Sequence, residues 1–145
     1  MLEDTKVIRP NKKELFVPES LAGLNGKFIG RPKSAKGLSP TRLGFYLRIP
    51  KLIETLVDCG KLLNNALGAY SDFDKKYVFT PCAEKGIVTV YGDSLTLLYA
   101  IQLTHDSDKP RFIHFRGYCN MRPDPLIEEL ISSAITRHLV EFYKK

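Results

Sequence analysis

Four segments in the second half of the chain carry the patterns of β-strands and constrain the fold most. Segment 77–80 (YVFT) and segment 86–91 (GIVTVY) are rich in β-branched and aromatic residues, and Gly92-Asp93 is a turn signal. In segment 94–105 apolar and polar residues alternate, which places five side chains on one face of a strand: Leu95, Leu97, Tyr99, Ile101 and Leu103. Segment 111–118 (RFIHFRGY) follows a second turn. The pattern predicts an antiparallel meander of three to four strands, although the leucines of 94–105 leave a helix as the second reading.

Two amphipathic helices are expected to flank these strands. The first begins at Pro50 and ends near Gly68, with apolar residues at spacings of three, four and seven. The last has Asp124 as its N-cap and Pro125 at its first position, followed by a broad apolar stripe. The sequence therefore predicts a compact α+β domain over residues 41–145, with its helices packed on one face of the sheet.

Positive charge is concentrated in the first third of the chain. Residues 1–51 hold eleven lysines or arginines against four acidic residues, a net charge of +7, whereas the remaining 94 residues hold eleven against twelve. Glycine, proline, serine and lysine dominate residues 26–40, which favours a loop or an extended chain. We expect residues 1–40 to form an extended basic N-terminal arm, and this asymmetry is typical of proteins that bind nucleic acid or another polyanion.

A short basic motif lies within this arm. Gly30-Arg31-Pro32-Lys33 resembles the core of an AT-hook, and the resemblance implies an arginine lying in the minor groove of A·T-rich DNA. It covers four residues, and Phe28 and Ile29 stand where the family has further basic residues. We predict instead contacts to phosphates that do not read the base sequence. The predicted contact residues are Lys12, Lys13, Lys27, Arg31, Lys33, Lys36, Arg42 and Arg48.

Aromatic and histidine side chains offer further candidates. Phe45 and Tyr46 lie between Arg42 and Arg48 and are expected in the core, with stacking on bases as the second reading. His138 falls on the apolar stripe of the last helix and is expected to be a core histidine whose ring is hydrogen-bonded.

Catalytic chemistry has little support in the sequence. His105 and His114 flank the turn at 105–110, and with Asp106 and Asp108 they would suit a metal such as zinc, although Asp and Ser also favour turns for their own backbone bonds. The chain has no phosphate-binding loop, dinucleotide-binding, zinc-protease or serine-hydrolase motif. We predict no catalytic residue, no metal and no cofactor.

The leading hypothesis is a non-enzymatic structural or assembly protein whose arm contacts DNA or RNA within a larger nucleoprotein assembly. One alternative is an adaptor that binds a protein partner through Leu15, Phe16, Val17 and Phe28. Another is a small metal-dependent or hydrolytic enzyme centred on His105 and His114.

The expected partners are nucleic acid and other protein subunits, and an open sheet edge would permit self-association. The three cysteines form no C-x-x-C, and neither a signal peptide nor an apolar run long enough to span a bilayer is present. These features predict a reducing intracellular compartment or a virion interior, without secretion or membrane contact.

Overall fold

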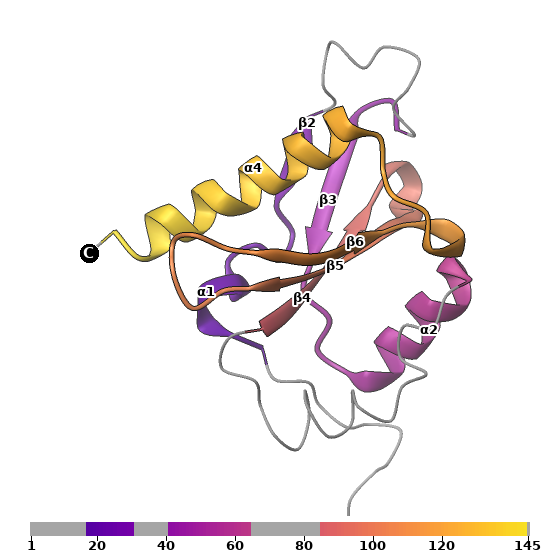
Figure 1. Cartoon of the computed structure of the whole chain (residues 1–145). Helices are drawn as coiled ribbons and strands as arrows, with labels where there is room; N and C mark the ends of the chain where they lie inside the picture. The colour runs from indigo at the N-terminus through magenta and orange to yellow at the C-terminus, as the bar shows by residue number, and fades with distance from the viewer. Residues whose placement is uncertain (1–16, 31–40, 65–84, 145) are drawn as a thin grey trace, which may run out of the picture.

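In the computed structural model, residues 17–30, 41–64 and 85–144 are described, and they form an α+β fold with a five-stranded antiparallel sheet (Figure 1). The strands lie across the sheet in the order β2 (Phe28–Gly30), β3 (Gly44–Arg48), β4 (Lys85–Tyr91), β5 (Leu97–Thr104) and β6 (Phe112–Arg116). The helices are α1 (Glu19–Ala22), α2 (Ile53–Leu63) and α4 (Pro125–Phe142). Two short 3₁₀ turns are η4 (Asp93–Leu95) and η5 (Tyr118–Asn120).

One face of the sheet, here called the core face, carries the main hydrophobic core. Alternate residues of the strands point to it, since successive side chains of a strand lie on opposite faces. Helices α1 and α4 cover this face, and α4 contributes five buried side chains to it. The core-face strand residues are Ile29, Phe45, Leu47, Val88, Val90, Tyr99, Ile101, Leu103 and Phe115.

Two glycines let α1 lie close to its neighbours. A Cβ atom at Gly23 would lie 2.9 Å from His138 Cε1 on α4, and one at Gly86 would lie 2.4 Å from Leu21 Cδ1. The His138 Nε2 atom is 2.9 Å from the backbone oxygen of Ser20, so the half-buried histidine ring is hydrogen-bonded. The prediction of a hydrogen-bonded histidine on this helix stripe is confirmed.

The opposite face of the sheet, here called the second face, is partly covered by α2 (Figure 1). Cys59 and Leu63 of α2 are buried outside the main core cluster, and Ile87 and Ala100 are buried beneath this side of the sheet. The expectation that both long helices share one face is therefore wrong. The sequence pattern records that a helix has an apolar side, but not which face of the sheet that side covers.

Several other expectations are corrected in detail. Within the described residues the sheet has five strands rather than three to four, because segments 28–30 and 44–48 add two strands beside β4. The first long helix runs over Ile53–Leu63 and ends at Asn64, whose left-handed backbone (φ 53°) terminates the helix before Gly68. The predicted strand at 77–80 lies outside the described residues.

The β4–β5 pairing is confirmed, but its alternation is interrupted. Val90 pairs with Tyr99 and Tyr91 pairs with Leu97, so Leu98 is an extra residue in β5. Leu95 lies in η4 and is exposed, and it does not share the core face with Tyr99.

The extended arm predicted over residues 1–40 is not confirmed. Residues 17–30 form α1 and β2, and Leu21 and Leu24 are fully buried in the main core. Residues 1–16 and 31–40 lie outside the described part of the chain. Among the helices that are described, none has the length and apolar character to cross a membrane.

Candidate functional site

A row of three aromatic side chains crosses the second face of the sheet. Phe28 pairs with Tyr46 across β2 and β3, and Tyr46 pairs with Tyr91 across β3 and β4. The ring centroids of Phe28 and Tyr46 are 5.0 Å apart, with the rings tilted by 53°. Phe28 is 47% exposed and Tyr46 is half-buried. These residues, Phe28, Tyr46 and Tyr91, are called the aromatic row below.

The aromatic row ends beneath α2. The Tyr91 hydroxyl lies 4.0 Å from Cys59 Sγ, within reach of a weak hydrogen bond. Burial raises the pKa of Tyr91 above its usual value, and the Cys59 side chain adds to the shift. Burial likewise raises the pKa of Cys59. Both groups are therefore neutral near pH 7, and the row itself carries no negative charge.

Arg48 supplies positive charge beside the row. Its side chain lies on the same face as Tyr46, two residues further along β3, and its guanidinium carbon is 5.6 Å from the centroid of the Tyr91 ring. This distance is within the range of a cation–π interaction. Arg48 is exposed and has no ion pair within the described residues, and a guanidinium can bind an anion through paired N–H groups.

The other predicted phosphate-contact residues fall into two groups. Lys27 is exposed immediately before β2, and its backbone oxygen accepts a hydrogen bond from the Leu47 N–H next to Arg48. Arg42 is exposed near the other end of β3, where its backbone N–H donates to Asp93. Basic side chains therefore lie at both ends of the β2–β3 pair. The remaining five, Lys12, Lys13, Arg31, Lys33 and Lys36, lie outside the described residues.

The basic residues around β2 and β3 differ from those near α4 in whether a carboxylate pairs with them. In the described part of the chain, no ion pair involves Lys27, Arg42, Arg48 or the exposed Lys51. Near α4, by contrast, Arg122 lies 3.7 Å from Glu128 and Lys144 lies 3.8 Å from Glu141. Within the described residues, the basic side chains around β2 and β3 are thus not ion-paired with carboxylates, and the Asp93 carboxylate at the end of β3 instead accepts hydrogen bonds from the backbone N–H groups of Arg42 and Leu43.

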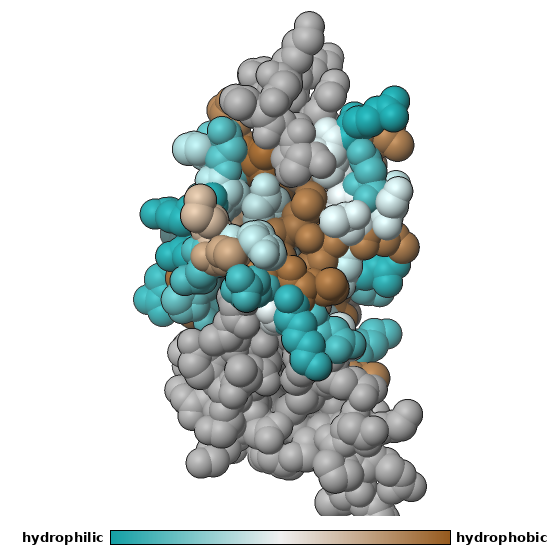
Figure 2. Space-filling view, turned by 90° about the vertical axis from the view of Figure 1, so that its right-hand side faces the viewer, coloured by the Kyte–Doolittle hydropathy of each residue, from teal (hydrophilic) through white to brown (hydrophobic). Residues whose placement is uncertain are grey.

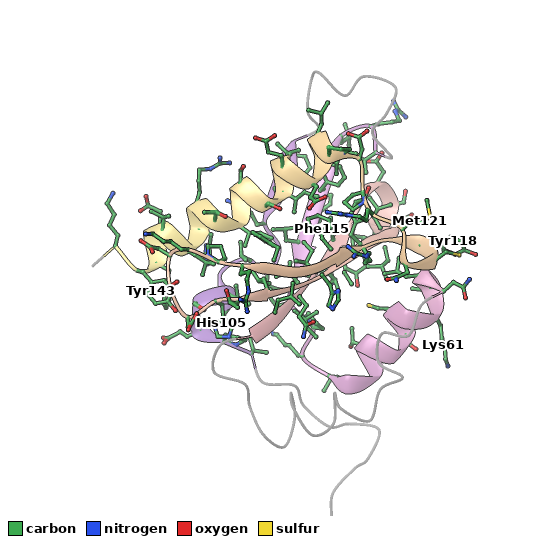
Figure 3. The ribbon with its side chains drawn as sticks, in the orientation of Figure 1. Lys61, His105, Phe115, Tyr118, Met121 and Tyr143 are labelled. Atoms are coloured by element: carbon green, nitrogen blue, oxygen red, sulfur yellow. The ribbon has the colours of Figure 1, made fainter. Side chains whose placement is uncertain are left out.

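The two histidines of the predicted alternative site do not come together. His114 pairs with Gln102 on the second face, whereas His105 is buried on the core side, with its Nδ1 atom 3.0 Å from Ser20 Oγ. Figure 3 shows His105 beside Tyr143, whose hydroxyl donates to the His105 backbone oxygen at 2.6 Å. Within residues 17–30, 41–64 and 85–144, no cluster of three or more His, Cys, Asp or Glu side chains could hold a metal ion.

An exposed apolar surface lies at the end of the sheet where η5 meets α2. Figure 2 shows hydrophobic side chains gathered near the middle of this side of the molecule. Tyr118 and Met121 lie on the same side of the molecule in Figure 3, and both are well exposed, as is Leu62 on α2. Asn64 Nδ2 donates to Cys119 Sγ at 3.2 Å and fastens the end of α2 to η5.

Sequence reasoning recognised parts of the aromatic row but not the row itself. It considered Phe28 as an anchor for a partner and Tyr46 as a stacking residue, and it passed over Tyr91. Strand periodicity places Tyr91 on the face opposite Val90, but the register between β3 and β4 aligns it with Tyr46. That register is a long-range pairing that the local pattern does not contain.

Comparison with protein families, with curated proteins and with solved structures finds no match to this chain.

Proposed function

We propose that this protein is a non-enzymatic nucleic-acid-binding component of a larger nucleoprotein assembly. The observation that carries the proposal is the set of exposed basic side chains around β2 and β3 that have no acidic partner in the described chain. They are Lys27, Arg42, Arg48 and Lys51. Unpaired surface cations beside neutral aromatic rings favour a polyanion with aromatic groups over an acidic protein surface.

The mechanism is charge neutralisation. Each phosphate contacted by a lysine or arginine releases counterions, so the affinity falls as the salt concentration rises. In a plot of log affinity against log salt concentration, the slope is about −0.7 per contact for single strands and about −0.9 for duplex DNA. Such contacts position the nucleic acid without reading its sequence. In the adaptor hypothesis, Val17 would be an anchor for a partner, but its side chain packs against the protein's own core.

The test measures binding of the full chain to labelled oligonucleotides across a salt series, by fluorescence anisotropy. A variant with Lys27→Gln, Arg42→Gln and Lys51→Gln removes three charges around β2 and β3 without touching the core. We expect weaker binding and a salt slope smaller by about two, since three contacts are lost.

The matched control removes three exposed charges elsewhere, through Lys109→Gln, Arg111→Gln and Arg137→Gln. It changes the net charge by the same amount, and we expect a much smaller change in slope. Equal effects of the two triple variants would show that only the net charge matters, and would contradict a site at β2 and β3. No binding by the wild-type chain at low salt would refute the proposed function.

The basic residues outside the described part of the chain need a separate variant. Arg31→Gln and Lys33→Gln neutralise the motif that resembles an AT-hook, and Lys36→Gln removes the next basic residue after it. We expect a further loss of affinity on duplex and single-stranded probes alike, because phosphate contacts are shared by both. A loss confined to A·T-rich duplexes would point to the minor groove instead.

A further inference from the structure

We infer that the second face of the sheet binds single-stranded nucleic acid by stacking bases on Phe28 and Tyr46, an inference that rests on the proposed function. Bases stack on aromatic side chains in proteins that bind single strands, and the flanking backbone follows positive charge. The β2–β3 pair provides both features within a few residues of each other: a ring pair, in which Phe28 is exposed and Tyr46 half-buried, and basic side chains at each end.

The backbone holds the Phe28 ring in place. A Cβ atom at Gly44 would lie 2.7 Å from Phe28 Cζ, so the ring occupies the space where any other residue would carry a side chain. The ring also contacts Tyr46, its partner across the strands. A ring positioned in this way needs little reorganisation to receive a base, which favours stacking over a loosely held surface aromatic.

Positive charge borders the rings along the strand direction. Lys27 and Arg48 lie at one end of the β2–β3 pair and Arg42 lies at the other. A nucleic-acid strand crossing Phe28 and Tyr46 would therefore meet a cation on each side. This charge complementarity selects a polyanion as the occupant of the face, rather than an apolar peptide.

The geometry favours single strands over duplexes. In a duplex the bases are stacked on one another and present only their edges, whereas unpaired bases can be splayed out onto a flat protein surface. Because stacking tolerates any base and either sugar, we expect both DNA and RNA single strands to bind.

A second aromatic pair provides a matched control. Phe142 and Tyr143 at the end of α4 have ring centroids 4.9 Å apart, and both are exposed. Their setting differs from that of the aromatic row. The Tyr143 hydroxyl donates a hydrogen bond to the His105 backbone oxygen, and the neighbouring Lys144 forms an ion pair with Glu141. We therefore expect no stacking of bases on this pair.

The experiment compares a variant carrying Phe28→Leu and Tyr46→Leu with the wild type and with Phe142→Leu. The probes are fluorescent oligo-dT and oligo-U of about 12 nucleotides, within the usual site size, and a duplex of equal length. We expect the double variant to lose about tenfold or more in affinity for single strands, the size of effect reported for stacked bases, and to keep its duplex affinity. Phe142→Leu and the ring-preserving Tyr46→Phe should bind as the wild type does.

Three results would overturn the inference. In the first, the double variant binds single strands with the same affinity as the wild type, while the Lys27→Gln, Arg42→Gln and Lys51→Gln triple variant still loses affinity. That outcome leaves the proposed function standing and removes the stacking role. The second is a wild-type preference for duplex over single strand. The third, no binding of either probe by the wild type, removes the proposed function as well. Thermal unfolding of each variant checks the fold, and Phe28→Leu alone repeats the test with a residue that is already half exposed.

Discussion

Two neighbouring residues of β3 occupy very different surroundings. Leu47 is fully buried in the main core beneath α1 and α4, whereas Tyr46 points to the second face and is only half-buried. Next along the strand, Arg48 is exposed. The same alternation continues into β4, where Val90 belongs to the core and Tyr91 to the aromatic row.

This difference separates stability from surface chemistry within one sheet. A strand alternates between its faces with a period of two, so one segment can supply core residues and surface residues at once. Substitutions at the exposed positions of the second face can therefore change the surface of the sheet while leaving the main core intact.

The largest expected effect comes from Leu47→Ala. Removal of a fully buried leucine deletes core contacts and leaves a cavity, and we expect a loss of about 2–5 kcal/mol in the free energy of unfolding. Tyr46→Ala should cost less than about 2 kcal/mol, since it removes one aromatic pair and partial burial. Urea unfolding of both variants measures the difference. A cost for Tyr46→Ala as large as that for Leu47→Ala would mean that the second face is packed as tightly around Tyr46 as the core face is around Leu47.

A smaller effect is expected where α1 lies against the sheet. Gly86→Ala places a Cβ atom 2.4 Å from Leu21 Cδ1 and 3.3 Å from His105 Cδ2, and both side chains are buried. We expect a loss of about 1–3 kcal/mol from overpacking. Gly30→Ala is the control, because nothing lies within 4 Å of its added Cβ atom. If the two variants unfold at the same denaturant concentration, α1 is not tightly packed on the core face.

The smallest effect concerns alkaline pH. Burial, with a lesser contribution from Asp124, raises the pKa of Tyr99 above its usual value near 10. The folded protein therefore keeps this proton where the unfolded chain loses it, and the corresponding stability is present below pH 10 and is lost as the pH rises further. Tyr99→Phe should make the decline in unfolding free energy above about pH 10 shallower. Tyr91 and Cys59, whose pKa values are also raised, contribute to the decline that remains. An unchanged pH profile would contradict the burial of the Tyr99 hydroxyl.

The sequence identified the elements whose determinants are local. The last helix begins as predicted, with Pro125 in its first turn and the Asp124 carboxylate accepting a hydrogen bond from the Leu126 N–H at 2.9 Å. Strands β4, β5 and β6 follow the predicted meander. Segment 28–30 was missed because three residues are too few to show a period, and only pairing with β3 makes them a strand.

The candidate site was less accessible to sequence reasoning. Charge counting located the basic third of the chain, and the structure describes Lys27, Arg42 and Arg48 as exposed within it. The sequence could not show that Phe28, Tyr46 and Tyr91 align on the sheet. That alignment depends on the register of three strands that are separated by long stretches of chain. Long-range register is decided by tertiary packing, and no local pattern reports it.

The contact between Ser20 and His138 joins residues separated by 118 positions in the chain. It has a consequence for synthesis on the ribosome, where the N-terminal part emerges first and waits for the rest. Residues 17–30 can bury Leu21 and Leu24 fully only after α4 has been translated, since α4 covers the same core. Until then the nascent chain exposes its apolar core face, and a chain that terminates before residue 125 would keep it exposed. Such products are expected to aggregate or to be degraded, so this fold is completed only after translation of its last helix.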